Sequence, residues 1–162
     1  MSSPLGAERD LGYMEQALVL AQEAASQGEI PIGALVVNAQ GNIIAAASNK
    51  TEQLCRQSAH AEMLALTRAG EILNNWRLTG CWLYVTLEPC LMCMGLIYLS
   101  RISGVVYGAR SPLFGVCLDS SRMASVYKVD TVTIIGGVCT EKASAIVQDF
   151  FKKRRSGYDG GE

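Results

Sequence analysis

The chain has 162 residues and a net charge of −1 at pH 7, with a pI of about 5.9. This length suits one domain with a core of ordinary size. The near-neutral charge excludes a surface that is basic throughout, so any nucleic-acid binding must use a local patch. No apolar run approaches the ~20 residues of a membrane-spanning helix. Apolar residues make up 49% of the chain, which is high for a soluble monomer and favours self-association.

The cysteines and the N-terminus indicate the compartment. The N-terminus lacks a basic segment followed by a continuous apolar core, so we expect no secretion signal. Six cysteines allow three disulfides outside the cell, but without export a metal-binding pair plus four ordinary thiols is the better interpretation. We therefore expect a cytoplasmic protein, in which the ordinary thiols are Cys55, Cys81, Cys117 and Cys139.

Hydrophobic periodicity predicts a single domain over residues 1–155, followed by a glycine-rich tail at 156–162. The predicted elements, after a mobile lead-in at 1–8, are a helix at 11–28, a hairpin of strands 32–37 and 42–47, a helix at 60–70, a strand at 82–87, a helix at 90–100, strands at 102–107 and 131–135, and a helix from Thr140 to Arg155. Because strand 102–107 directly follows a helix, we expect a parallel crossover. The order predicts an α/β fold of three α/β/α layers around a five-stranded mixed sheet.

Some finer expectations follow from the same patterns. We expect Met63, Leu64 and Leu66 to be buried on the helix that starts at His60. Thr140 is expected to cap the last helix. Residues 108–123 show no clean period, and loops of this length are usually functional or mobile.

The most informative residues are one histidine, one acid and two cysteines. His60 is the only histidine, and Cys90 and Cys93 form the only Cys-x-x-Cys pair. One imidazole and two thiolates supply three ligands for a tetrahedral zinc and leave the fourth position open for water, as in a catalytic zinc site. Glu62 is then available as a general acid and base beside that water.

Helix geometry sets conditions on this site. Pro89 suits the start of a helix, and Cys90 and Cys93, three apart, share a face of its first turn, where the helix dipole favours thiolate. His60 and Glu62 are two apart and would point to different sides in mid-helix. They converge only if His60 is at the very start of its helix.

Other interpretations of these residues remain open. The Cys-x-x-Cys pair alone is also typical of redox proteins, but that assignment gives His60 no role. The histidine and thiols could also be ordinary core residues, and Glu62 a solvated charge on a helix.

The order His60-Ala61-Glu62, then Pro89-Cys90-x-x-Cys93, is the signature of zinc-dependent nucleoside and nucleobase deaminases. From about residue 11 to residue 155 the chain resembles the TadA-like tRNA-specific adenosine deaminases. The segments that carry this resemblance are residues 29–34, 59–62, 75–78, 83–90, 100–102, 106–110 and 149–155. The resemblance implies a cytidine-deaminase-like fold, one zinc ion per subunit, a homodimer, and conversion of adenosine to inosine at the wobble position of a tRNA anticodon.

The resemblance also implies a set of substrate contacts. It places Asn49 against the purine, and Ile32 and Leu87 in the walls of the base pocket, although on sequence alone these are ordinary strand residues. It uses the last helix, with Phe151 and Arg154, to hold the anticodon loop, whereas cations at a helix C-terminus also simply complement its dipole.

The loop after residue 108 is where the chain departs from the resemblance. Arg110 and Phe114 suit either stacking on a nucleotide or an ordinary surface position. TadA-like enzymes usually carry Asp after Gly-Ala-Arg, but this chain has Ser111, which is neutral and shorter. This leaves open a deaminase of free guanine or cytosine with the same fold. A non-catalytic zinc or RNA-binding protein is a third possibility, against which Glu62 argues.

Overall fold

The structure is a computed structural model that describes residues 1–116 and 132–158. Cys117 and the second half of the loop expected at 108–123 lie outside these residues. In chain order the elements are α1 (Ala7–Ser26), β1 (Gly33–Val37), β2 (Ile43–Ser48), α2 (Thr51–Leu54), α3 (Ala61–Leu73), β3 (Trp82–Leu87), α4 (Leu91–Leu99), β4 (Gly104–Ala109), β5 (Thr133–Gly136) and α6 (Thr140–Tyr158). None of the helices in these residues is long and apolar enough to cross a membrane.

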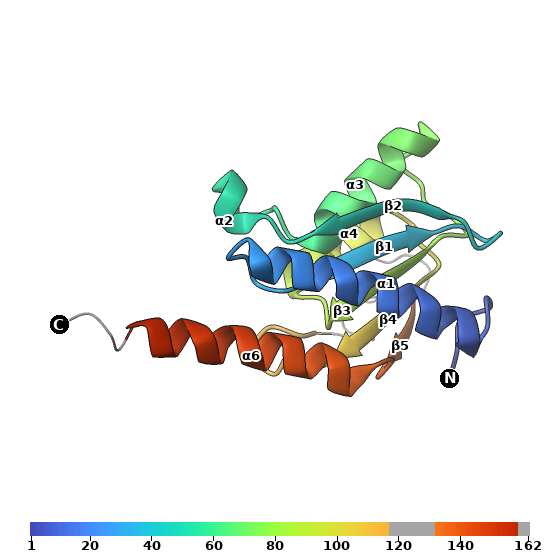
Figure 1. Ribbon diagram of the computed structural model, residues 1–162. Coiled ribbons are helices and arrows are strands. Elements are labelled where there is room, and N and C mark those ends of the chain that lie inside the picture. Colours follow the sequence, from blue (N-terminus) through green and yellow to red (C-terminus); the bar gives the residue numbers. More distant parts are fainter. Residues whose placement is uncertain (117–131, 159–162) are drawn as a thin grey trace.

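The strands form one five-stranded sheet in the order β2-β1-β3-β4-β5. Strand β1 is antiparallel to both β2 and β3, while β3, β4 and β5 run parallel. Helices α1 and α6 cover one face of the sheet, and α3 and α4 lie on the other (Figure 1). The predicted three-layer architecture, mixed sheet and parallel crossover are therefore confirmed.

Alternate residues of β1 build two separate cores. Leu35 and Val37 pack in the cluster that includes Met14 of α1, whereas Val36 packs in the cluster that includes Leu66 of α3. Successive side chains of a strand point to opposite faces, so a strand buried on both faces is apolar throughout.

The N-terminus differs from the expected mobile lead-in. Ser3 is buried, its hydroxyl donates to Asp10 Oδ1 at 2.5 Å, and its backbone N donates to Asp10 Oδ2 at 2.7 Å. Tyr84 in the central strand donates to the same carboxylate at 2.7 Å. A buried carboxylate needs such donors, and the sequence pattern gave no sign that Ser3 would supply them.

Other boundaries also differ from the prediction. Helix α3 continues to Leu73 rather than stopping near Gly70, and of the three residues expected to be buried only Leu66 is, while Met63 and Leu64 are half-buried. The short helix α2 was not expected. Helix α6 extends past Arg155 to Tyr158.

The expected cap of α6 is also wrong. Thr140 is the first residue of the helix, and its hydroxyl donates to the Gly108 carbonyl at 3.1 Å. It therefore ties α6 to the end of β4 instead of capping the helix.

Candidate active site

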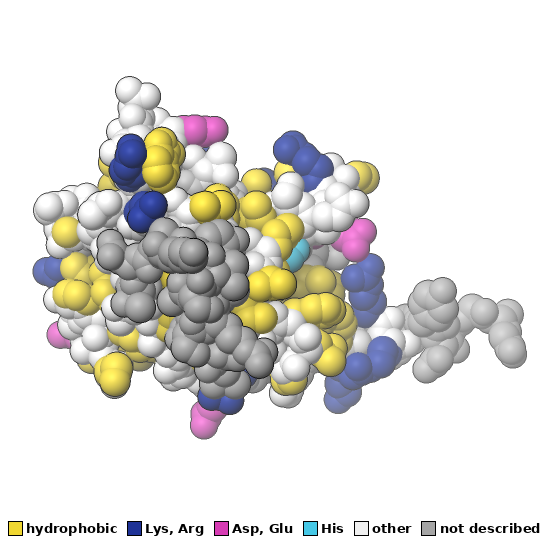
Figure 2. Space-filling model, turned by 180° about the vertical axis from the view of Figure 1, so that it is seen from behind, with side chains coloured by type: hydrophobic (Ala, Val, Ile, Leu, Met, Phe, Trp, Pro, Cys, Tyr) yellow, Lys and Arg dark blue, Asp and Glu magenta, His cyan; other side chains and the backbone are white. Residues whose placement is uncertain are grey.

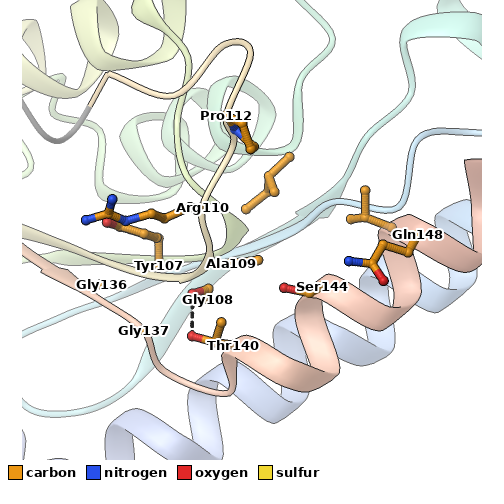
Figure 3. Close-up of a pocket in the computed structure, with 12 residues that line it drawn as sticks. Tyr107, Gly108, Ala109, Arg110, Pro112, Gly136, Gly137, Thr140, Ser144 and Gln148 are labelled. Carbon is orange, nitrogen blue, oxygen red and sulfur yellow. Dashed lines mark hydrogen bonds between the residues drawn. The ribbon is translucent and has the colours of Figure 1, made fainter.

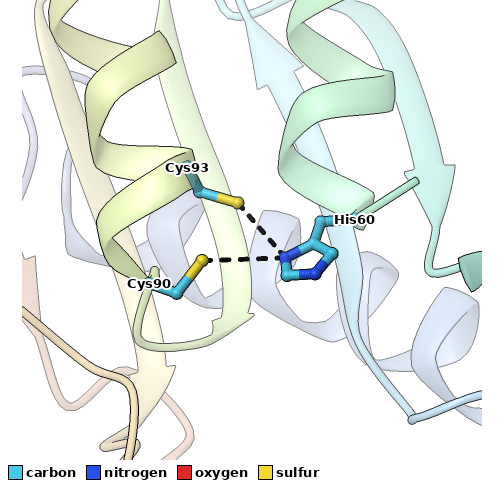
Figure 4. Close-up of side chains that lie close together, drawn as sticks. All are labelled: His60, Cys90 and Cys93. Carbon is cyan, nitrogen blue, oxygen red and sulfur yellow. Dashed lines mark hydrogen bonds between the residues drawn. The ribbon is translucent and has the colours of Figure 1, made fainter. Parts of the chain in front are cut away.

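His60, Cys90 and Cys93 come together between the N-terminal ends of α3 and α4 (Figure 4). Their ligand atoms all lie within 4.8 Å of one another. His60 Nδ1 is 3.7 Å from Cys90 Sγ and 3.4 Å from Cys93 Sγ. Tetrahedral zinc with ordinary Zn–S and Zn–N lengths would separate such an N and S by about 3.6 Å. The three side chains therefore have the spacing that a zinc ion requires.

Both ligand-bearing segments are helix starts. His60 is the N-cap of α3 and Cys90 the N-cap of α4, each with an extended backbone. Glu62 is the second residue of α3, so the condition that His60 begin its helix is met. Cys93 lies in the first turn of α4, as predicted. The positive ends of both helix dipoles thus meet at the site, where they favour thiolate ligands.

Glu62 lies buried beside this cluster. Its side chain is 3% exposed, and within the described part of the chain nothing hydrogen-bonds to its Oε2. Burial raises the pKa of Glu62, and the opposing attraction of His60 is smaller. An orphaned buried carboxylate oxygen is costly, so a polar group is expected beside it when the site is at work.

The two thiols differ in their ionisation. A hydrogen bond from Cys93 is the largest cause that lowers the pKa of Cys90 to about 4, and His60 lowers it further. The pKa of Cys93 is raised, by its hydrogen bond to Cys90 and by burial. For the half-buried Cys90 and the buried Cys93 both to be thiolates, a cation is needed to balance their charge. The donor set therefore fits zinc.

The sheet register brings three of the predicted substrate residues to one end of the sheet. Gly33 pairs with Ser48 and Ala34 with Val85, so the chain just before β1 lies between the ends of β2 and β3. Ile32, Asn49 and Leu87 stand at these three ends, and the Asn49 backbone N donates to the Ile32 carbonyl at 2.9 Å.

The same end of the sheet is tied to the zinc ligands. Lys50 N donates to the Ala59 carbonyl at 3.0 Å, directly before His60. Leu87 is two residues from Pro89, which leads into Cys90. The predicted base contacts therefore lie close to both chain segments that carry the candidate zinc ligands, the one before His60 and the one before Cys90.

Sequence reasoning missed the residue that holds Asn49. Glu29 is 1% exposed, and its carboxylate accepts from the Asn49 amide at 3.1 Å. It also accepts from the backbone N of Glu52 at 3.2 Å and of Gln53 at 2.7 Å, and so fixes the start of α2. Glu29 opens the segment 29–34 that carries the resemblance, but only the folded chain shows what it binds.

The predicted loop contacts lie beside the cluster rather than in it. Ser111 is half-buried, and its backbone N donates to Glu88 Oε2 at 3.1 Å. Arg110 is exposed, and Phe114 is 70% exposed. Arg110 and Leu87 line a cavity of about 760 Å³ between the end of β4 and α6 (Figure 3). His60, Cys90 and Cys93 do not line this cavity, and the loop is tied to the segment that leads to Cys90 through Ser111 and Glu88.

The basic end of α6 lies on the side of the molecule where α2 follows Asn49. Arg154 Nη2 of α6 is 3.8 Å from Glu52 Oε1 of α2, so these two exposed side chains meet, and Phe151 is 38% exposed. Figure 2 shows the single histidine in a hollow among apolar side chains, with Lys and Arg side chains towards the end where α6 projects. A local basic patch is therefore present despite the net charge of −1.

Comparison with known proteins assigns the family. Residues 7–109 match the family described as the cytidine and deoxycytidylate deaminase zinc-binding region. The chain belongs to this family. It is therefore a zinc-dependent hydrolytic enzyme, and His60, Cys90 and Cys93 form its candidate zinc site.

Individual relatives give a narrower likeness. The chain is 41% identical to a tRNA-specific adenosine deaminase of Bacillus subtilis over 88% of this chain and 89% of that one. A solved structure of a tRNA:A34 deaminase, studied for A-to-I editing at the wobble position, aligns with a TM-score of 0.77 at 38% identity, over 83% of this chain and 98% of that one. A guanine deaminase from Bacillus subtilis aligns with a TM-score of 0.58 at 33% identity, over 74% and 70%. The cytidine-deaminase-like fold is confirmed.

The three other cysteines that the structure describes, Cys55, Cys81 and Cys139, lie outside this site. Cys81 is buried in the core and Cys55 is exposed. Cys139 is half-buried next to α6. These three match the expected packing or incidental roles.

The zinc assignment predicts a difference between matched cysteine variants. Cys90→Ser and Cys93→Ser each remove one of three protein ligands, so zinc content should fall from one ion per chain to roughly a tenth of that or less after dialysis against a weak chelator. Cys55→Ser removes an exposed thiol outside the cluster and should keep full zinc. Elemental analysis of the purified variants measures this. Full zinc in Cys90→Ser would contradict the ligand set.

Proposed function

We infer that this deaminase converts adenosine to inosine at the wobble position of a tRNA anticodon. The observation that carries the proposal is the His60, Cys90 and Cys93 cluster with the orphaned Glu62 oxygen beside it, in a chain so similar to tRNA-specific adenosine deaminases. Of the two kinds of deaminase compared, the tRNA-editing one aligns at the higher sequence identity, 38% against 33%.

The reaction adds water to C6 of adenine and releases ammonia, leaving inosine. When bound by the three ligands, zinc supplies a Lewis acid that lowers the pKa of a water molecule at the open position. Glu62 takes the proton from the attacking water, delivers a proton to N1, and transfers one to the leaving amine. Burial raises the pKa of this carboxyl, which suits a group that must both accept and return a proton.

The base enters a slot at the end of the sheet. In this proposal Asn49 hydrogen-bonds the purine, and the half-buried Ile32 and Leu87 form the apolar walls against a flipped base. Glu29 fixes the Asn49 amide, so that the base meets a preset hydrogen-bonding group rather than a mobile one.

The anticodon loop rests on the rim around this slot. Arg110, Ser111 and Phe114 contact nucleotides from one side, and Phe151 and Arg154 from α6 on the other. The neutral Ser111 keeps a hydroxyl for a ribose 2′-OH. Recognition then depends on the shape of a splayed loop, because the overall charge offers little attraction.

We propose that the enzyme works in the cytoplasm as a homodimer. The cysteines in the described ranges, 1–116 and 132–158, are free thiols, which suits a reducing compartment. Large apolar side chains are exposed near the end of α3 and on α4, among them Ile72, Trp76, Leu91 and Leu99. A second copy would cover this surface.

Activity on a minimal substrate tests the function. An anticodon stem-loop with adenosine at the wobble position should yield inosine and ammonia, and Glu62→Ala should lower the rate by roughly 10³-fold while retaining zinc, because only the proton transfers are lost. Free guanine and cytosine serve as comparison substrates. Ammonia only from a free base would keep the zinc chemistry and overturn the proposed substrate.

The role of α6 is tested by salt dependence. Phe151→Ala and Arg154→Ala should each raise KM for the stem-loop about tenfold. Only Arg154→Ala should also reduce the slope of log affinity against log salt, by about 1, because one phosphate contact is lost. Equal slopes in the two variants would mean that Arg154 makes no phosphate contact.

The dimer is tested by a matched pair of surface variants. Leu99 on α4 is 54% exposed and Val19 on α1 is 53% exposed. Leu99→Glu places a charge in the proposed interface and should give a monomer, whereas Val19→Glu should leave the dimer intact. Light scattering during size-exclusion chromatography gives the mass of each. A wild-type monomer would refute the homodimer.

A further inference from the structure

The loop after β4 is anchored at several points to the segment that carries Cys90. Glu88 N donates to the Ala109 carbonyl at 2.8 Å, before the loop begins. Gly115 then forms a β-bridge with Cys90, and Val116 N donates to the Pro89 carbonyl at 3.3 Å. The loop therefore leaves and returns to the same stretch of chain, directly beside a zinc ligand.

The buried side chain of Glu88 holds the first part of this loop. Glu88 is 5% exposed, and its Oε2 accepts from the Ser111 backbone N at 3.1 Å. Gly115 packs directly on the Glu88 carboxyl group, since a Cβ at this position would overlap Glu88 Cδ and Oε2 and lie 2.7 Å from the Ser111 carbonyl. Ser111 itself accepts from Gly115 N at 2.8 Å. The first and last residues of the turn thus enclose a buried carboxyl group.

The residues between these anchors face solvent. Leu113 is 86% exposed and Phe114 is 70% exposed. Two large apolar side chains held out by a short, anchored turn suit contact with an unstacked base. A turn that moved freely would lose conformational entropy on binding such a base, so fixing it beforehand strengthens binding.

We propose that Glu88 is a positioning residue for RNA binding. Its buried carboxyl group holds the turn Ser111–Gly115 against the Cys90 segment and so presents the exposed rim to the nucleotides that flank the target adenosine. This inference rests on the proposed function, because the ligand is the anticodon loop. The anchor uses the backbone of residue 111, so it is compatible with serine in place of the usual aspartate.

The test compares Glu88→Ala with Glu88→Gln, which keeps an oxygen acceptor for Ser111 N. Glu88→Ala should speed hydrogen exchange of the peptide covering residues 111–115 by about tenfold or more, and raise KM for the anticodon stem-loop by a similar factor, because a buried hydrogen bond to a carboxyl group is lost. Its zinc content and its kcat at saturating stem-loop should stay within about threefold of wild type. In Glu88→Gln, both the exchange rate and KM should be close to the wild-type values.

Gly115→Ala attacks the same contact from the other side. It should raise KM as Glu88→Ala does, and the double variant should raise it by less than the product of the two single effects, because both changes release the same turn.

Three results would overturn the inference. One is unchanged exchange in Glu88→Ala. Another is faster exchange with an unchanged KM, and a third is a joint loss of zinc and kcat at constant KM, which would give Glu88 a role in the metal site instead. If wild-type protein makes no inosine, the proposed function fails, and the exchange rates together with stem-loop affinity measured by fluorescence anisotropy still decide the role of Glu88.

Discussion

The meeting of two helix N-termini is the constraint on which this structure depends. His60 and Cys90 are both N-cap residues with extended backbones, so their side chains reach across the helix ends towards each other. Moving either helix start by one residue would turn a ligand away from the cluster. The sheet serves this arrangement, because β3 delivers the chain to Cys90 and the segment after β2 leads to His60.

Around the metal cluster, buried acids organise the surrounding backbone. Glu62 is left with an orphaned oxygen, which fits a group that handles protons. Both oxygens of Glu29 and Oε2 of Glu88 accept hydrogen bonds from neighbouring segments, which fits groups that hold position. In the proposed mechanism, the carboxyl group that keeps an oxygen without a hydrogen bond is the one that reacts.

The chain combines a candidate zinc site with a net charge near zero. Its net charge of −1 gives no general attraction for RNA, so in the proposed function the affinity for RNA depends on the rim formed by the turn at 111–115 and by α6. In that proposal, the affinity for RNA also depends on how firmly the turn is anchored. Ser111 lacks the acidic side chain of the usual aspartate, but its backbone N still donates the hydrogen bond that holds the turn.

The sequence by itself determined the three-layer fold, the candidate zinc ligands His60, Cys90 and Cys93, and the requirement that His60 start its helix. These depend on local periodicity, on ligand chemistry and on helix geometry, all of which are written in short stretches of chain. Only the tertiary structure decided what Ser3, Glu29 and Glu88 do, because each of them binds a partner from another segment. Ser3 binds Asp10 and Tyr84. Glu29 binds Asn49 and the start of α2, and Glu88 binds the backbone of Ser111. A hydrogen bond between distant segments produces no periodic pattern in the sequence, because it depends on how the sheet places the loops.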